Sequence, residues 1–395
     1  MTDSIRRLES SVRLVEEVLA GQRRAIARAI SLVEENPSGA GTRGAEAQAL
    51  LAALHPYTGR AHIIGVTGPP GSGKSSLVNA LTLEFRKGTV EVPPCTVGII
   101  AIDPTSPFSG GAILGDRIRM RDLAGDSGIF IRSMASRGNL GGLAWATADA
   151  VKVLDAGGFD LIIIETVGAG QAEVDIARTA HTTIVVEVPG LGDDIQAIKA
   201  GILEIADVFA VNKADQEGAD HAVMALEMML DLNAGGHVTV LHHGRLMEVV
   251  TAVQQAGEVT DILPSRQAGS ATALWAATEG CPSSLGGTKW RPPIQKTVAI
   301  RREGIAELAG AIRAHRAHLE KTGGLVWRER ERAAAEVETM IQQEALRQVL
   351  RGIDRAQLTA LIDRIVQREL DPYTASQQLL RMQNKVAQTA PASQT

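Results

Sequence analysis

Several features that would narrow the class of this protein are scarce in its sequence. Cys95 and Cys281 are the only cysteines among 395 residues, and without a Cys-x-x-Cys pair they do not indicate a zinc site or a redox motif. Aromatic residues make up 3% and the net charge is -5, so neither base stacking nor a basic surface for nucleic acid is indicated. The first residues lack the apolar stretch of a signal peptide, and no apolar run approaches the roughly 20 residues that span a bilayer. We therefore expect a reduced, cytoplasmic protein with no nucleic-acid and no membrane partner.

The order of apolar patterns predicts an α/β fold. Residues 4–35 show helical spacing, and a break follows at Asn36–Gly41. From His62 onward, short apolar runs alternate with amphipathic helical segments, which is typical of a doubly wound, mostly parallel sheet covered by helices on both faces. The expected strands are His62–Thr67, Thr96–Asp103, Ile129–Met134, Leu161–Thr166, Thr183–Val188, Val208–Asn212 and Lys296–Ile300.

The rest of the chain departs from this alternation in two places. Residues 237–288 are rich in Gly and Ser in part and lie between two expected strands, so we interpret them as an insertion. After Gly304 the pattern is helical, with helices expected at Ile305–Leu319, Val326–Gln348, Ala356–Arg368 and Ala375–Val386. We predict three regions: N-terminal helices over 1–60, a main domain over 61–320 that contains the insertion, and C-terminal helices with a tail over 321–395.

The strongest motif is a phosphate-binding loop. The sequence Gly68-Pro69-Pro70-Gly71-Ser72-Gly73-Lys74-Ser75 fits G-x-x-x-x-G-K-[ST], follows an apolar strand and leads into a helix that includes Ser76. Glycines let backbone amides turn toward phosphate oxygens, and the helix N-terminus adds positive potential. Lys74 is expected to bridge the β- and γ-phosphates, and the Ser75 hydroxyl is expected to bind Mg²⁺.

Carboxylates at strand ends supply candidate partners for Mg²⁺. Asp103 ends the second expected strand and Glu165 the fourth, and ligands of open parallel sheets lie at these carboxyl ends. Gly168 follows closely and would let a backbone amide approach the γ-phosphate. Asp116, within Gly115-Asp116-Arg117, is a further candidate. An Asp at a strand end is also a common turn or cap residue, so the phosphate loop is what favours the functional interpretation.

A base-selecting motif closes a later strand. In Asn212-Lys213-Ala214-Asp215, the Asp215 carboxylate can accept hydrogen bonds from N1–H and the 2-amino group of guanine, whereas adenine would leave it unpaired. Asn212 is expected to contact the guanine carbonyl edge, and the stem of Lys213 is expected to lie over the ring. The motif therefore favours GTP and GDP over adenine nucleotides.

Together these residues resemble the GTPase chaperones of adenosylcobalamin-dependent acyl-CoA mutases, the methylmalonyl-CoA mutase-associated family. The resemblance runs from about residue 20 to 230 and again near Trp290–Ile305. Three stretches are the most specific to that family: Gly138–Gly142, Glu165–Gln171 and Pro189–Gln196.

The resemblance implies properties that spacing alone does not give. Pro189–Lys199 resembles the family's third switch, with Asp193 and Lys199 at its charged positions, although Asp193 would also suit a helix cap. The helices after Gly304 resemble the family's dimerisation arm, which implies a homodimer. The implied task is to gate cofactor loading and protection of an acyl-CoA mutase. Where the family has a Ser-Ala pair behind the base, this chain has Val298-Ala299, and the Ala299 amide could still bond guanine.

Other functions remain as alternatives. An ATP-dependent kinase linked to a transport system would share the phosphate loop, but Asp215 argues against it. A nickel-type metallochaperone GTPase would use histidines such as His221, His237, His242 and His243, although no cysteine-rich or long histidine-rich motif accompanies them. A nucleotide-independent scaffold would function without Lys74. No Gln or His stands out as positioning the attacking water, which is consistent with slow hydrolysis that a partner accelerates.

Overall fold

The computed structural model describes most of the chain. Its described residues fall into two compact units, one holding those up to Arg332 and the other holding those from Ala333 onward. None of the described helices is long and apolar enough to cross a membrane. The described residues are 12–35, 41–88, 93–104, 121–123, 125–136, 142–166, 176, 178–190, 205–233, 238–242, 245–249, 290–351 and 353–379.

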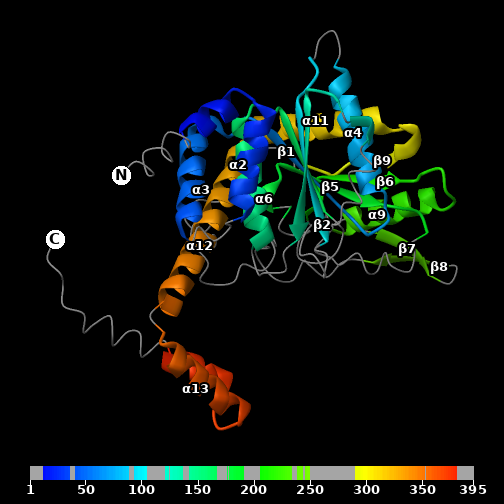
Figure 1. The fold of residues 1–395 in the computed structure, drawn as a ribbon. Helices are drawn as coiled ribbons and strands as arrows, with labels where there is room; N and C mark the ends of the chain where they lie inside the picture. Colours follow the sequence, from blue (N-terminus) through cyan, green and yellow to red (C-terminus); the bar gives the residue numbers. More distant parts are fainter. Residues whose placement is uncertain are drawn as a thin grey trace. The chain divides into compact units, whose positions relative to one another are not determined.

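The first unit is built on a seven-stranded sheet with the strand order β3-β2-β4-β1-β5-β6-β9 (Figure 1). Every neighbouring pair in it is parallel. The doubly wound parallel fold predicted from the sequence is therefore confirmed. The strands are β1 (His62–Thr67), β2 (Val97–Pro104), β3 (Ile129–Ser136), β4 (Leu161–Glu165), β5 (Thr182–Glu187), β6 (Val208–Asn212) and β9 (Ile294–Thr297).

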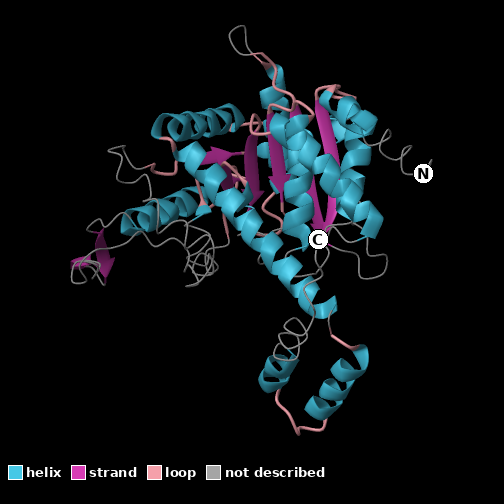
Figure 2. Ribbon diagram, turned by 90° about the vertical axis from the view of Figure 1, so that its left-hand side faces the viewer, coloured by secondary structure: helices cyan, strands magenta, loops and turns pink. Residues whose placement is uncertain are grey.

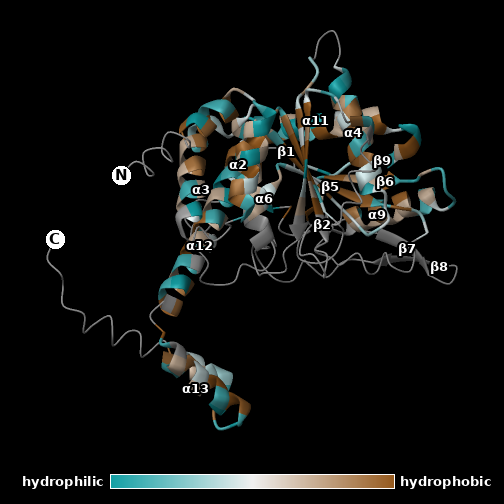
Figure 3. Cartoon of the chain, viewed as in Figure 1, coloured by the Kyte–Doolittle hydropathy of each residue, from teal (hydrophilic) through white to brown (hydrophobic). Residues whose placement is uncertain are grey.

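Consecutive strand residues point to opposite faces of the sheet, and each face has its own apolar core. Ile63 and Ile162 pack with α2 (Arg23–Glu35), α3 (Gly41–Leu54) and α6 (Gly142–Ala156). Ile64 and Ile163 pack on the other face with α4 (Lys74–Lys87) and α11 (Ile305–Thr322). The helices accordingly cover both sides of the sheet, and its central strands are strongly apolar (Figures 2 and 3). This double covering explains why β1, β4, β5 and β6 are buried at every residue.

The N-terminal helices differ in one respect from the predicted pattern. Residues 12–19 form a helix and α2 starts at Arg23, with a break between them. Gly21 lies in this break with φ 69°, a left-handed conformation that suits glycine and ends the first helix. Apolar spacing continues across the break because both helices pack on the same core, and spacing alone therefore could not reveal the turn.

The seventh strand differs in its bounds from the prediction, and the chain between it and β6 forms elements outside the sheet. The expected strand Lys296–Ile300 is shifted, because β9 covers Ile294–Thr297 and a 3₁₀ turn, η5, covers Ala299–Arg301. β9 pairs directly with β6, so the chain between them leaves the sheet and returns. This excursion holds α9 (Ala219–Asn233) and a hairpin of β7 (Val238–His242) and β8 (Arg245–Val249), and residues 250–289 lie outside the described part.

The C-terminal part is helical, as expected. α12 (Gly324–Arg351) starts in the first unit, and α13 (Arg355–Val366) lies in the second. Asp354 caps α13 by accepting a hydrogen bond from the Ala356 amide at 3.1 Å. A further helix covers 372–379, so it begins three residues before the expected Ala375–Val386 helix, and the residues after 379 lie outside the described part. The proposed boundaries at residues 60 and 320 stay predictions.

Candidate nucleotide site

The phosphate loop turns directly out of the central strand. Gly68 has φ 140°, and a Cβ atom there would lie 2.2 Å from the carbonyl oxygen of Val186 in β5, so only glycine fits. Gly73 has φ 86° and is the N-cap of α4, where it provides no capping side chain. A Cβ atom at Gly73 would lie 2.5 Å from Asn212 Nδ2. The glycines thus let the loop pass between β5 and the base motif, and α4 begins at the carboxyl edge of the sheet.

Lys74 and Ser75 begin α4 and are both buried. The Lys74 ammonium donates to the carbonyl oxygens of Gly68 and Pro69 at 2.9 and 3.0 Å, so it lies against the loop itself. The Ser75 hydroxyl donates to Glu165 Oε1 at 2.6 Å. Ser75 and Glu165 are only 6% and 4% exposed, so the hydroxyl and the carboxylate predicted to serve one ion are adjacent and shielded from water.

The remaining phosphate-site candidates are described only in part. Asp103 lies in β2 two residues beyond Ala101, which is in register with Glu165, so the backbone places Asp103 at the same edge. Its side chain lies outside the described part, as do Asp116 and Gly168. Ser72 is fully buried, and its hydroxyl has no hydrogen-bond partner among the described residues. Ser76 is half-buried in the first turn of α4.

Asn212 fastens the base motif to the phosphate loop. Its Nδ2 donates to the Ser72 carbonyl at 2.8 Å, and its Oδ1 accepts from the Ala299 amide at 3.1 Å and the Thr297 hydroxyl at 3.3 Å. The side chain is 2% exposed. Asn212 and the Ala299 amide, both expected to contact guanine, are hydrogen-bonded to each other, and their contact with the base stays a prediction. Asn212 therefore joins three segments that are distant in the sequence.

The next residues carry the chain outward from this junction. Lys213 has φ 57°, a left-handed turn, and its ammonium donates to the Gly71 carbonyl at 2.9 Å. The Ala214 amide donates to the Thr297 carbonyl at 3.0 Å. Asp215 follows at the rim, where its side chain is 37% exposed and pairs with Arg301 at 3.1 Å. The Lys213 side chain thus connects the base motif to the phosphate loop. The Asp215 carboxylate, in contrast, is accessible to solvent.

The predicted switch residues and the histidines of the nickel alternative are not part of this site as described. Asp193 and Lys199, expected in a switch, lie outside the described residues. Of the histidines that a nickel site would use, His221 is exposed on α9, whereas His237, His243 and the side chain of His242 lie outside the described part. The described part of the chain contains no group of three or more potential metal-ligating side chains.

Sequence reasoning missed a polar cluster at the opposite edge of the sheet, where the parallel strands begin. His62 opens β1, and its Nε2 lies 2.8 Å from the hydroxyl of Thr182, which opens β5. The same hydroxyl lies 2.9 Å from His315 Nδ1, and His315 Nε2 lies 3.3 Å from Asp207 Oδ1. We call His62, His181, Thr182, Asp207, His315 and Arg328 the amino-edge cluster.

Asp207 is the centre of the amino-edge cluster. Arg328 of α12 donates to it twice, through NH2 to Oδ1 at 2.6 Å and through NH1 to Oδ2 at 2.9 Å. The Thr183 amide donates to Oδ2 at 2.8 Å, and the Trp290 indole donates to the Asp207 carbonyl at 2.8 Å. Arg328 also donates to the His181 carbonyl at 2.5 Å. One carboxylate therefore attaches the first turns of α12 to the sheet.

The histidines of this cluster are held neutral. Burial lowers the pKa of His315 to about 4, although the nearby Asp207 carboxylate opposes the shift. Burial also lowers the pKa of His62 well below its ordinary value, and neighbouring cations add to the effect. The pKa of His181 is lowered by burial as well, against the opposing influence of Glu329. Their ring nitrogens consequently serve as neutral hydrogen-bond donors and acceptors.

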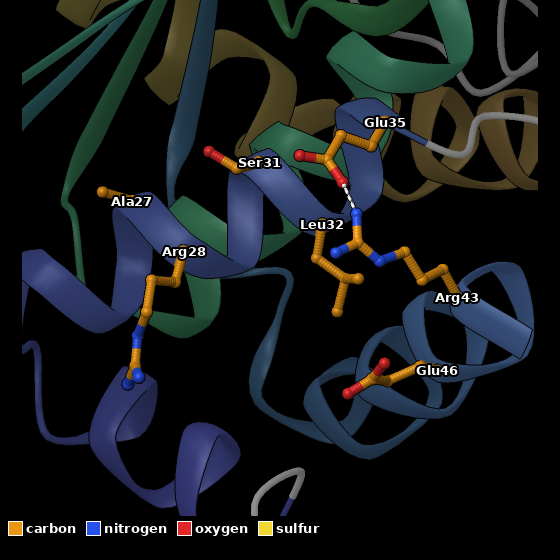
Figure 4. A pocket seen from close by; sticks show the side chains of 7 residues that line it. All are labelled: Ala27, Arg28, Ser31, Leu32, Glu35, Arg43 and Glu46. Atoms are coloured by element: carbon orange, nitrogen blue, oxygen red, sulfur yellow. Dashed lines mark hydrogen bonds and ion pairs between the residues drawn. The ribbon is translucent and has the colours of Figure 1, made fainter. Parts of the chain in front are cut away.

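A pocket lies between α2 and α3 (Figure 4). Three of its four charged side chains have partners, since Arg43 pairs with Glu35 at 2.5 Å and Arg28 pairs with Glu17 at 2.5 Å. Most of the charge on its lining side chains is therefore compensated. The residues that line it are Ala27, Arg28, Ser31, Leu32, Glu35, Arg43 and Glu46.

Comparisons with known proteins agree with the motifs. The family model described as methylmalonyl Co-A mutase-associated GTPase MeaB matches residues 26–354. A putative GTPase of Pyrococcus abyssi is 43% identical over 368 residues, which cover 93% of this chain and 95% of the relative. The mouse protein described as methylmalonic aciduria type A homolog, mitochondrial, is 37% identical over 217 residues, which cover 51% of this chain and 49% of the mouse protein.

A solved structure extends the comparison to the fold. The crystal structure described as an LAO/AO transport system kinase aligns with a TM-score of 0.61 at 24% identity, covering 95% of this chain and 97% of its own. At that identity the likeness concerns the fold alone. The family match, in contrast, spans the phosphate loop, the base motif and the η5 turn. The chain belongs to the MeaB family of methylmalonyl-CoA mutase-associated GTPases, and it is a phosphate-loop GTPase.

Proposed function

We infer that this GTPase acts as a chaperone for an adenosylcobalamin-dependent acyl-CoA mutase of the methylmalonyl-CoA mutase type. In this proposal, the nucleotide state gates the loading of intact cofactor and protects the loaded mutase. The family match over residues 26–354 supports the proposal, because that family is described by its association with methylmalonyl-CoA mutase. The mouse relative's description refers to methylmalonic aciduria, which concerns the same acyl group.

The single observation that best supports nucleotide binding is the junction at Asn212. Its bonds to Ser72 and Ala299 hold the phosphate loop and the base motif at one edge of the sheet, as a single nucleotide spanning both requires. Backbone amides of the phosphate loop and the α4 N-terminus would bind phosphates, and Lys74 would bind the β- and γ-phosphates. The Asp215 carboxylate would select guanine at the other end. GTP and GDP are thus the proposed ligands.

The residues present fit a magnesium ion. Ser75 and Glu165 bring a hydroxyl and a carboxylate oxygen within 2.6 Å of each other, and Mg²⁺ prefers such oxygen ligands. Asp103 and Asp116 are the further proposed ligands or water-mediated partners. Bound Mg²⁺ would neutralise charge that develops on the phosphates. Glu165 and Ser75 would hold their orientation through their mutual hydrogen bond.

Communication with the mutase would depend on segments outside the phosphate loop and the base motif. Gly168 would sense the γ-phosphate, and the switch containing Asp193 and Lys199 would transmit the change. The helices of the second unit are the proposed homodimerisation surface. α12 and α13 expose apolar side chains there, which a partner chain would bury. Those exposed by more than half are Val337, Ile341, Leu346, Leu350 and Val366.

The test is GTP turnover by the purified protein with and without candidate B12-dependent acyl-CoA mutases. Acceleration by one mutase, with no acceleration by an unrelated enzyme of similar size, is the expected result. If no mutase changes turnover or forms a complex, the chaperone role is wrong while the GTPase assignment stands. Equal turnover of ATP, or transfer of the γ-phosphate to a protein, would instead favour the kinase alternative.

A further inference from the structure

The η5 turn brings an arginine to the base-selecting carboxylate. β9 runs in register with β6, Asn212 opposite Thr297, so the residues after the two strands lie side by side. Arg301 NH1 donates to Asp215 Oδ2 at 3.1 Å. Arg301 is the last residue of η5, and its side chain is 51% exposed. The contact therefore joins two loops at the rim of the nucleotide site.

Arg301 is itself held from the other side. Its Nε donates to Glu303 Oε1 at 2.8 Å, and its NH2 donates to Glu303 Oε2 at 3.3 Å. The Glu303 backbone is fixed in turn, because it exchanges hydrogen bonds with Val298 at 3.0 and 3.3 Å. The guanidinium fork thus uses two nitrogens on Glu303 and directs the third toward Asp215, an orientation that its planar geometry favours.

We propose that Arg301 is a positioning residue for guanine selection, which orients the Asp215 carboxylate so that it can accept two hydrogen bonds from the base. The proposal rests on the guanine site inferred above. Each carboxylate oxygen has two lone pairs, so Oδ2 can accept from Arg301 and still accept from a ligand, while Oδ1 accepts from neither Arg301 nor any other described residue. A carboxylate on an exposed loop would otherwise rotate, and the base would then have to order it upon binding.

The base chemistry gives this role a distinctive signature. Guanine presents N1–H and a 2-amino group, and a carboxylate must be correctly oriented to accept from both. Hypoxanthine presents N1–H alone, and one oxygen in almost any orientation can accept from it. Loss of Arg301 should therefore weaken GDP more than IDP, whereas simple loss of a positive charge should weaken both nucleotides equally.

The test compares the dissociation constants of GDP and IDP by calorimetry for matched variants. Arg301→Gln should weaken GDP about two- to five-fold, the range expected for an exposed ion pair, and should weaken IDP less. Arg302→Gln removes the same charge from the neighbouring residue and should leave both constants unchanged. Glu303→Gln frees Arg301 without altering it and should weaken GDP in the same direction by a smaller factor.

A double-mutant cycle with Asp215→Ala completes the experiment. Once Asp215 is absent, Arg301→Gln should have no further effect on GDP binding. Equal weakening of GDP and IDP by Arg301→Gln, no weakening of either, or the same effect in the Asp215→Ala background would overturn the positioning role. A wild-type protein that prefers GDP to IDP despite such results would leave the guanine site standing. Failure of the wild-type protein to bind GDP would overturn both.

Discussion

The two edges of the central sheet carry polar groups that are organised in opposite ways. At the amino edge, Asp207 is saturated by Arg328, the Thr183 amide and His315, and its side chain is 10% exposed. At the carboxyl edge, Asp215 is 37% exposed and accepts from one side chain among the described residues, that of Arg301. A saturated buried network fixes structure, whereas a carboxylate with remaining acceptor capacity can still bind a ligand. Both edges carry charged groups. What distinguishes the amino edge from the candidate site is that the hydrogen-bonding capacity of its carboxylate is filled by protein donors.

The largest expected effect is a loss of GTP turnover from a substitution at the carboxyl edge, which should leave the amino-edge cluster intact. Lys74→Ala should lower kcat/KM for GTP by at least roughly 100-fold, because the ammonium is expected to stabilise charge on the β- and γ-phosphates. Circular dichroism should show an intact fold. Lys87→Ala, at the exposed C-terminal end of the same helix, is the matched control and should retain activity. Full turnover by the Lys74 variant would exclude the phosphate-loop role.

The second prediction concerns a substitution in the amino-edge cluster, which should lower stability. Asp207→Asn should lower the free energy of unfolding by about 2–3 kcal/mol, because it leaves the largely buried Arg328 guanidinium without its charged partner. Urea denaturation measures this loss. The control is Asp220→Asn, whose exposed pair with Lys296 should not affect stability. The GDP affinity of folded Asp207→Asn protein should stay unchanged, and a selective loss of GDP binding would show that the two edges are coupled.

The third prediction concerns the pH dependence of stability. The folded-state pKa of His315 is about 4, below the unfolded value of about 6.5, so the unfolded chain binds more protons between these values. The stabilisation is complete above about pH 6.5 and is lost as the pH falls toward 4, by about 2 kcal/mol at pH 5. His62 and His181 shift in the same direction and add to the loss.

Unfolding free energies measured from pH 8 to pH 5 check this expectation. His315→Gln should lower stability at pH 8 and flatten the pH dependence. An unchanged slope in this variant would place the acid sensitivity at other groups. Since no carboxyl-edge residue takes part, the GDP affinity of the protein that remains folded should follow a different pH profile.

The parts of the fold that local patterns determine could be predicted from the sequence. Strands such as Leu161–Glu165 are apolar on both faces because helices cover both faces, and that signal lies within a few consecutive residues. The phosphate loop is also contiguous, so its glycines, Lys74 and Ser75 could be located before the structure was known. The strand Lys296–Ile300 was misplaced because Val298-Ala299-Ile300 is apolar yet belongs to a turn.

Features that depend on distant partners could not be predicted. Asn212 is expected at the base from its motif, but its partners Ser72 and Ala299 lie far away in the sequence on either side. The amino-edge cluster is harder still, because its histidines and Asp207 each resemble an ordinary polar residue at a strand start or on a helix. The register of β1, β5 and β6 brings His62, His181 and Asp207 together, and the packing of α11 adds His315. Arg301 likewise comes within hydrogen-bonding distance of Asp215 only because β9 pairs with β6.

The hydrogen bonds of the Asn212 side chain affect how the binding free energies of the phosphate and nucleoside parts of a nucleotide would combine. Since one side chain connects the loop after β1 with the segments after β6 and β9, these three pieces of backbone are ordered together before any ligand arrives. A diphosphate fragment and a free guanine nucleoside would each encounter a preassembled half-site. Joining the two fragments covalently should then gain the full entropic advantage of linkage, because neither half of the ligand has to organise protein for the other.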